Sequence, residues 1–219
     1  MAARDEVRLK ISRESARLFL ANGIADTSGD AIAAAAGVST RTVWRHFANK
    51  ENCIEPVLAV SIQRFARILD EWPLDQALED HLRVAMPLDG EASALIADGV
   101  IAVRLVALCG KEPAIRCVWL EAYHALEVRV QDVVARRANR SSLDFDVRLC
   151  AATIVAAIRV LDEGISVAAV TEERSYTSAD LVALMSDAIR TAATLPICDP
   201  IAVGIYHLWG GGSVRAKRD

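Results

Sequence analysis

The segment from residue 30 to residue 50 constrains the fold more strongly than any other part of the chain. It contains an alanine-rich run around Ile32, then Gly37, whose missing side chain allows a tight turn, and then Ser39, which can cap a helix by accepting from a free N–H. Two short helices on either side of Gly37 are therefore predicted. Helices joined by such a turn form a helix-turn-helix.

The second of these helices, residues 40–46, is too polar to be a core helix. Val43 is its only aliphatic residue. Side chains that suit base edges and phosphates in a major groove belong to Thr40, Arg41, Thr42 and Arg45. Phe47 is expected to turn inward and close the unit. Asn49 can cap the next element, which leaves the amine of Lys50 in a first turn and well placed for a phosphate.

Composition indicates a helical protein with a large core. Hydrophobic residues make up 53% of the 219 residues and aromatic residues only 5%, and the apolar stretches are rich in alanine and leucine. Charge is unevenly distributed. Residues 1–50 hold eight Lys and Arg against five Asp and Glu, so the net charge of −4 splits into +3 for this segment and −7 for the rest. A basic head on an acidic body fits DNA contact confined to the N-terminal segment.

Cysteines and apolar stretches bear on the compartment and the chemistry. Five cysteines, none in a CxxC pair, and a charged N-terminus without a signal peptide indicate free thiols in a reducing cytoplasm. Charges interrupt the longest apolar stretches, so no membrane span is expected. Known catalytic patterns are missing, so we expect neither enzymatic activity nor a cofactor. Cys117, Glu121 and His124 have a spacing that could hold zinc, but this arises often by chance and no metal site is expected.

The N-terminal pattern resembles the TetR family of transcriptional regulators. The matching positions are Ile11, Ala16, Leu18, Phe19, Gly23, Thr27, Ile32, Ala33, Ala36, Gly37, Val38, Ser39, Thr42, Trp44, His46, Phe47, Lys50 and Glu51. The resemblance is specific over this segment. Beyond residue 70 it consists only of a succession of helices of the expected kind.

Three departures from the family pattern affect the helix-turn-helix. Trp44 stands where tyrosine is usual, Gly29 and Asp30 start the supporting helix, and Ala31 deprives Ser28 of the acidic partner that completes a capping box. This helix is therefore expected to start weakly. If Asp30 faces DNA, it either repels a phosphate or accepts from a cytosine amino group, and the sequence leaves both alternatives open.

The resemblance implies an all-α fold in four parts. Residues 1–50 are expected to form a three-helix helix-turn-helix DNA-binding domain, and residues 51–72 a connecting helix. Residues 73–209 are expected to form a helical ligand-binding and dimerisation domain, and residues 210–219 a flexible tail. Such a protein is expected to be a repressor that binds a near-palindromic operator as a homodimer and is released by a small, largely apolar molecule. The alternative is a helical small-molecule binding protein without operator recognition, supported by Gly29 and Asp30.

Polar residues of the helix-turn-helix are expected to make two kinds of DNA contact. Base readout is expected from Thr40, Arg41 and Arg45. Contact with the DNA backbone is expected from Ser28, Thr42, Trp44, His46 and Lys50.

Hydrophobic periodicity divides the chain outside the helix-turn-helix into further helices. Their expected bounds are Arg4–Ala21, 50–70, Leu74–Met86, Glu91–Cys109, Ala114–Ala138, Asp144–Val170 and Ser178–Thr194. Pro56 predicts a kink or a tight early turn in the connecting helix, which we expect to transmit the ligand response. The helix from residue 91 is apolar on every face and is expected to be buried. Arg136 and Arg137 are expected to point outward.

The last two helices are expected to form the dimer interface, at about residues 145–194. Both are heavily apolar, so the pair can pack against its copy as a four-helix bundle. An ordinary intrachain core is the competing interpretation. After Pro200 a short apolar segment runs to Trp209, and a flexible end follows.

A ligand pocket between the helices follows from the resemblance. The expected lining consists of Trp72, Met86, Leu105, Trp119, Tyr123 and Val155, with Tyr123 and His124 as polar anchors. Simple core packing is the competing interpretation. Arg159 interrupts the most apolar helix. Its partner is either a carboxylate, from Glu163 one turn on or from Asp162 across the dimer, or the anionic end of the ligand.

Overall fold

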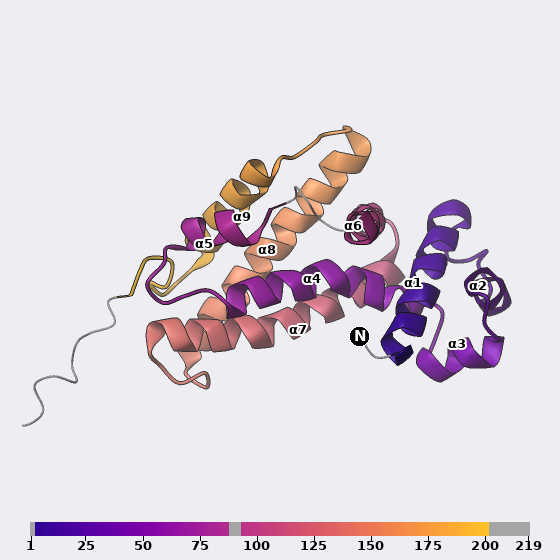
Figure 1. Ribbon diagram of the computed structural model, residues 1–219, viewed down its shortest axis with the longest axis horizontal. Coiled ribbons are helices and arrows are strands. Elements are labelled where there is room, and N and C mark those ends of the chain that lie inside the picture. Colours follow the sequence, from indigo (N-terminus) through magenta and orange to yellow (C-terminus); the bar gives the residue numbers. More distant parts are fainter. Residues whose placement is uncertain (1–2, 88–92, 202–219) are drawn as a thin grey trace, which may run out of the picture.

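The first three helices pack around a small apolar core at one end of the molecule (Figure 1). The structure is a computed structural model that describes residues 3–87 and 93–201. Helices α1, α2 and α3 span Ala3–Asn22, Gly29–Ala36 and Thr40–His46. Ile11, Ile32 and Val43, one from each helix, are fully buried and hold the unit together. The predicted three-helix unit is therefore present.

The connection to the rest of the chain has the tight early turn, one of the two alternatives that Pro56 predicts, and not the kink. Residues Glu51–Ile54 form a 3-10 turn, and helix α4 then spans Glu55–Asp70. Pro56 is thus the second residue of α4, where its missing N–H removes no helical hydrogen bond. The early turn is confirmed, and the kink is wrong. The N–H of Val57 donates to Oγ of the buried Ser12 at 3.0 Å, which fixes the start of α4 against α1.

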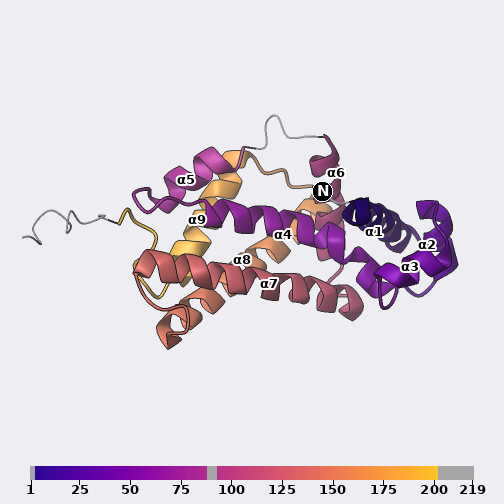
Figure 2. The same cartoon turned by 60° about the horizontal axis from the view of Figure 1, so that its bottom comes forward.

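Five further helices complete the described part of the chain. Helices α5 to α9 span Leu78–Ala85, Ser93–Val106, Pro113–Ala138, Phe145–Thr171 and Ser178–Ala192. Helices α4 and α7 run side by side, α8 packs against α7, and α5 and α9 lie at the end far from α2 and α3 (Figures 1 and 2). Among the described residues, no helix combines the length and apolarity needed to cross a bilayer.

Helix α5 begins later than the periodicity predicts, at Leu78 instead of Leu74. The reason is a pairing with the segment that follows α9. The N–H of Leu78 donates to the carbonyl of Cys198 at 2.9 Å, and the N–H of Ile201 donates to the carbonyl of Leu74 at 2.7 Å. These backbone partners replace the helical hydrogen bonds that a longer α5 would make.

Arg137 points inward, so its predicted outward orientation is wrong. It is only 3% exposed, and its guanidinium lies 3.5 Å from the ring centroid of Trp72. Four backbone carbonyls accept from it at 2.6 to 3.2 Å; they belong to Pro73, Gln76, Ile197 and Asp199. Burial lowers the pKa of this guanidinium to about 10. The side chain thus ties α7 to the segments before α5 and after α9, and its charge is well solvated by carbonyls.

Helix α6 is less buried than its apolar sequence predicts. Leu95, Ile96 and Val100 are 42%, 51% and 54% exposed. Val160 on α8 and Leu184 on α9 are exposed as well. Among the described residues of a single chain, nothing covers these surfaces, although the apolar sequences of α6, α8 and α9 predict that they are covered. The expected apolar end and flexible tail beyond residue 201 lie outside the described residues.

Candidate DNA-binding surface and ligand cavity

The turn between α2 and α3 is held by the groups that the sequence places at its two ends. Gly37 adopts a left-handed conformation with φ 64°, in which a side chain would be strained. The N–H of Val38 donates to the carbonyl of Ala33 at 3.0 Å and closes the end of α2. Ser39 starts α3, because its Oγ accepts from the N–H of Thr42 at 3.1 Å.

Helix α3 is anchored on one side and free on the other. Val43 is fully buried and Phe47 is nearly so. Arg41 and Arg45 lie one turn apart and are exposed, as is Trp44. Within residues 3–87 and 93–201, neither guanidinium has a hydrogen bond or an ion pair. Two unpaired arginines on one face of an exposed helix suit an anionic partner.

Asp30 orients the first residue of α3. Its Oδ1 accepts from the hydroxyl of Thr40 at 2.7 Å, across the turn between α2 and α3. The hydroxyl oxygen of Thr40 still has its lone pairs for other donors. Both roles that the sequence left open for Asp30 involved DNA, whereas its partner in the structure is Thr40.

Lys50 is engaged within the protein. Its Nζ donates to the carbonyls of Ile24 and Thr27 at 2.6 and 3.1 Å, and it lies 3.4 Å from that of Ala25. The amine thereby closes the loop between α1 and α2. A phosphate contact, as predicted from the sequence, would compete with these carbonyls.

The other residues expected to contact the DNA backbone lie around the same surface. Ser28 is exposed and caps α2 by accepting a backbone N–H at 3.1 Å. Oγ1 of Thr42 lies 2.9 Å from Oγ of Ser39. Burial, followed by the charge of Arg45, lowers the pKa of the partly buried His46. The neutral imidazole is therefore favoured, and it offers one N–H donor.

Trp44 and Gly29, two departures from the family pattern, fit one another. A methyl group at Gly29 would overlap the indole of Trp44. The larger aromatic residue on α3 is therefore accommodated by the missing side chain at the start of α2. Because the two residues lie on different helices, the sequence alone does not show that these departures compensate each other.

A partly buried ion pair joins the helix-turn-helix to α6. Nε and Nη2 of Arg13 on α1 donate to the two carboxylate oxygens of Asp98 at 2.6 and 2.7 Å. Asp98 is 2% exposed, and the hydrogen bond to it raises the pKa of Arg13. A forked pair of this geometry restricts α1 and α6 to one relative position. This pair was not predictable from the sequence, because 85 residues separate its members.

A cavity of about 800 Å³ lies between α4, α6 and α8. Its walls are mainly apolar, and its volume is in the range of sites for small organic molecules. The lining includes Leu58, Ile62, Ile96, Val100, Trp119, Ile165 and Val170, together with Asp162 and the rim residues Arg104 and Arg174. Helix α6 therefore contacts α1 through Asp98 and lines the cavity in its next turn.

Of the residues expected to line a ligand pocket, Trp119 is on the wall of this cavity. Leu105, Tyr123 and Val155 are buried among other core side chains, and Trp72 lies beneath Arg137. Met86 is partly buried at the end of α5, and His124 is exposed. Arg159 is partly buried, and its Nη1 lies 3.9 Å from Oε2 of Glu163.

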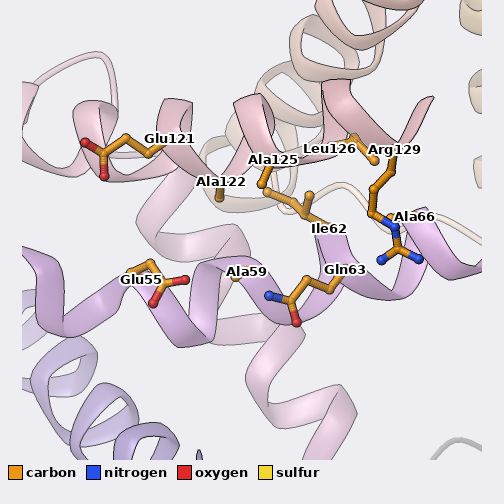
Figure 3. Close-up of a pocket in the computed structure, with 10 residues that line it drawn as sticks. All are labelled: Glu55, Ala59, Ile62, Gln63, Ala66, Glu121, Ala122, Ala125, Leu126 and Arg129. Carbon is orange, nitrogen blue, oxygen red and sulfur yellow. The ribbon is translucent and has the colours of Figure 1, made fainter. Parts of the chain in front are cut away.

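A second, smaller cavity of about 230 Å³ lies between α4 and α7 (Figure 3). Ala59 and Ala125, from the two facing helices, leave the gap, and the side chain of Arg129 extends from α7 toward α4. Arg129 forms an ion pair with Asp70 of α4. This cavity is below the usual size of an organic ligand site, so the larger cavity is the better candidate.

The protein is thus a helix-turn-helix protein with two parts. A small three-helix unit exposes α3, and a helical domain with a large cavity follows it. Residues 11–57 match the family model described as bacterial regulatory proteins, tetR family. The chain is 30% identical over 148 residues to the HTH-type transcriptional regulator TcmR of Streptomyces glaucescens. The aligned segment covers 64% of this chain and 64% of that protein.

Solved structures agree on the fold. A putative TetR-family transcriptional regulator from Rhodococcus sp. has a TM-score of 0.54 at 23% identity, covering 86% of this chain and 99% of that chain. The fatty acid degradation regulator FadR from Bacillus halodurans has a TM-score of 0.54 at 17% identity, covering 86% and 95%. Residues 11–57 therefore match the TetR family, and the described chain has the fold of these solved structures. The expected resemblance of the N-terminal segment to the TetR family and the expected all-α fold are both confirmed.

Proposed function

We propose that the protein is a ligand-responsive transcriptional repressor that acts in the cytoplasm. The observation that carries this proposal is the exposed outer face of α3, on which Arg41 and Arg45 are unpaired within the described residues. Guanidinium groups on a helix that protrudes from a helix-turn-helix suit guanine edges and phosphates in a major groove. Residues 1–50 would bind DNA, and residues 73–209 would bind the ligand and form the dimer. Residues 51–72 would connect these two domains.

The repressor would act as a homodimer through α8 and α9. Support comes from Val160, Val167 and Leu184, which are 61%, 38% and 38% exposed in the single chain. Pairing these helices with their copies in a four-helix bundle would cover them. A two-fold dimer places two α3 helices in successive major grooves, about 34–36 Å apart, on a near-palindromic operator.

The effector would be a small, largely apolar molecule in the cavity between α4, α6 and α8. Because α6 lines that cavity and also holds Arg13 through Asp98, a ligand that shifts α6 changes the position of α1. Its effect on DNA affinity is limited by its preference for one arrangement over the other. The alternative, a small-molecule binding protein without operator recognition, was supported only by Gly29 and Asp30. That support is lost, because Gly29 makes room for Trp44 and Asp30 accepts a hydrogen bond from Thr40.

Binding to DNA from upstream of the protein's own gene tests the proposal. Fluorescence anisotropy of the full chain, measured between low and physiological salt, should show a steep loss of affinity with salt and a strong preference over random duplex. Equal affinity for both duplexes would contradict the proposed operator recognition.

A further inference from the structure

The large cavity contains a carboxylate to which the proposed DNA binding assigns no role. Asp162 of α8 is partly buried and lies on the cavity wall beside Trp119. Most of the surrounding wall is aliphatic and includes Ile62, Val106 and Ile165. An ionisable group in such surroundings is costly unless it has a partner.

Only one oxygen of this carboxylate is engaged. Tyr123 donates its hydroxyl hydrogen to Oδ2 of Asp162 at 2.8 Å, and Nε1 of Trp119 donates to the same oxygen at 3.3 Å. In the part of the chain that the structure describes, no donor reaches Oδ1. Tyr123 and Trp119 therefore orient the carboxylate and leave one acceptor for a further donor.

Asp162 has no cationic partner among the described residues, whereas the neighbouring Glu163 has one. Oε1 of Glu163 accepts from Arg116 at 3.0 Å, and Arg159 lies within 3.9 Å of its other oxygen. Among residues 3–87 and 93–201, no salt bridge reaches Asp162. Burial raises the pKa of the Asp162 carboxyl, as expected for an acid without a cationic partner.

Three arginines are among the residues that line the cavity, and Arg64 of α4 is partly buried. Arg104 and Arg174 line the cavity, but both are exposed, and Arg174 also lies over the ring of Tyr176. Water and salt screen exposed charges far more than a buried one. Among the described residues, Oδ1 of Asp162 thus remains an acceptor on the cavity wall without a donor.

We propose that Asp162 is the polar recognition point of the cavity, and that the effector is an apolar molecule carrying a hydrogen-bond donor, a protonated amine or a hydroxyl, that reaches Oδ1. This inference rests on the proposed function, which supplies a ligand-responsive cavity. A donor to an ionised group contributes more than a donor to a neutral one. Apolar walls supply the remaining affinity without selecting the end group.

Four pyrene derivatives that differ in one substituent test the inference on the full chain. They are 1-methylpyrene, 1-pyrenemethanol, 1-pyrenemethylamine and 1-pyrenecarboxylate, and their binding is followed by fluorescence titration. We expect the amine and the alcohol to bind at least about ten-fold more tightly than the methyl compound. The ranking of the amine against the alcohol identifies whether a cation or a neutral donor is preferred.

Asp162→Asn is the decisive variant, because an amide oxygen can still accept from Tyr123 and Trp119 while the negative charge is removed. It should abolish the preference for the amine and leave binding of 1-methylpyrene unchanged. Glu163→Gln makes the same change one residue along the helix and should keep the preference. Should Asp162→Asn fail to fold, Tyr123→Phe removes one donor to the carboxylate, so the amine preference should increase, and an unchanged preference would overturn the inference.

The outcomes separate the inference from the proposed function. Equal affinity for all four probes, tightest binding of the carboxylate, or an amine preference that survives in Asp162→Asn would overturn the inference. In those cases, release of the protein from DNA by any of the probes would still support a ligand-responsive repressor. Failure of all four probes to bind would overturn both, because the cavity would then not admit apolar molecules.

Discussion

The indole of Trp44 occupies the space that the missing side chain of Gly29 leaves free. This contact joins the first residue of α2 to the exposed face of α3. The orientation of the DNA-binding helix thus depends on a glycine that, judged by helix propensity alone, weakens the start of α2. Helix propensity and packing therefore make opposite predictions for the same substitution.

Gly29→Ala should destabilise the protein in the presence of Trp44 and stabilise it in a Trp44→Ala background. Propensity favours alanine by up to about 1 kcal/mol, but the added methyl group displaces the indole. Chemical unfolding of the four proteins in a double-mutant cycle measures this coupling. Equal effects of Gly29→Ala in both backgrounds would show that the two residues are independent.

Arg41→Ala should weaken binding to the operator by about 1–3 kcal/mol and relax the preference at one base position. The reason is that its exposed guanidinium is free to reach a base edge. Affinities for single-base variants of the operator provide the measurement. A uniform loss across all sequences would assign Arg41 to a phosphate instead. Arg17→Ala is a matched control, because that exposed arginine of α1 already pairs with Glu14.

Asp98→Asn should reduce the effect of the ligand on DNA affinity more than DNA affinity itself. The substitution removes the charge that holds Arg13 while keeping a side chain of the same shape. DNA binding measured with and without ligand gives the coupling free energy directly. An unchanged ligand effect would exclude this ion pair as a link between the cavity and α1. Asp80→Asn, in the exposed pair with Arg83, serves as the control.

The ion pair between Glu79 and Arg190 should make stability depend on pH on the acid side. The hydrogen bond from Arg190, at 2.8 Å, lowers the pKa of Glu79 below its ordinary value. This stabilisation is present above the unfolded pKa and is lost as the pH falls through the lower folded pKa. The difference in unfolding free energy between the wild type and Glu79→Gln should therefore shrink at acid pH. A difference that is constant with pH would show that the pair contributes nothing.

Periodicity and local turn chemistry were sufficient for most of the fold. The stripe of Val118, Ala122 and Leu126 predicted α7, and the Gly37 turn with its Ser39 cap predicted the helix-turn-helix. The late start of α5 was not predictable, because it depends on pairing with a segment more than a hundred residues further along the chain. Arg137 was misjudged for the same reason, since its carbonyl partners come from distant segments.

The candidate site was less accessible from the sequence than the fold. The exposure of Arg41 and Arg45 was predictable, because Val43 is the only aliphatic residue of this short helix and marks its buried side. The lining of the cavity depends on which helices cross, and single-sequence patterns do not specify helix crossing. Asp162, an acid in an apolar helix, was the visible signal, but the only role predicted for it was that of a partner for Arg159.

Methylation protection of guanine N7 on the operator tests the central claim most directly, because N7 lies in the major groove. We predict two protected patches, separated centre to centre by about 10–10.5 base pairs and related by the operator's two-fold symmetry. Arg41→Ala or Arg45→Ala should weaken protection in both patches together. A single patch, or protection unaffected by both substitutions, would contradict a dimer that reads DNA through two copies of α3.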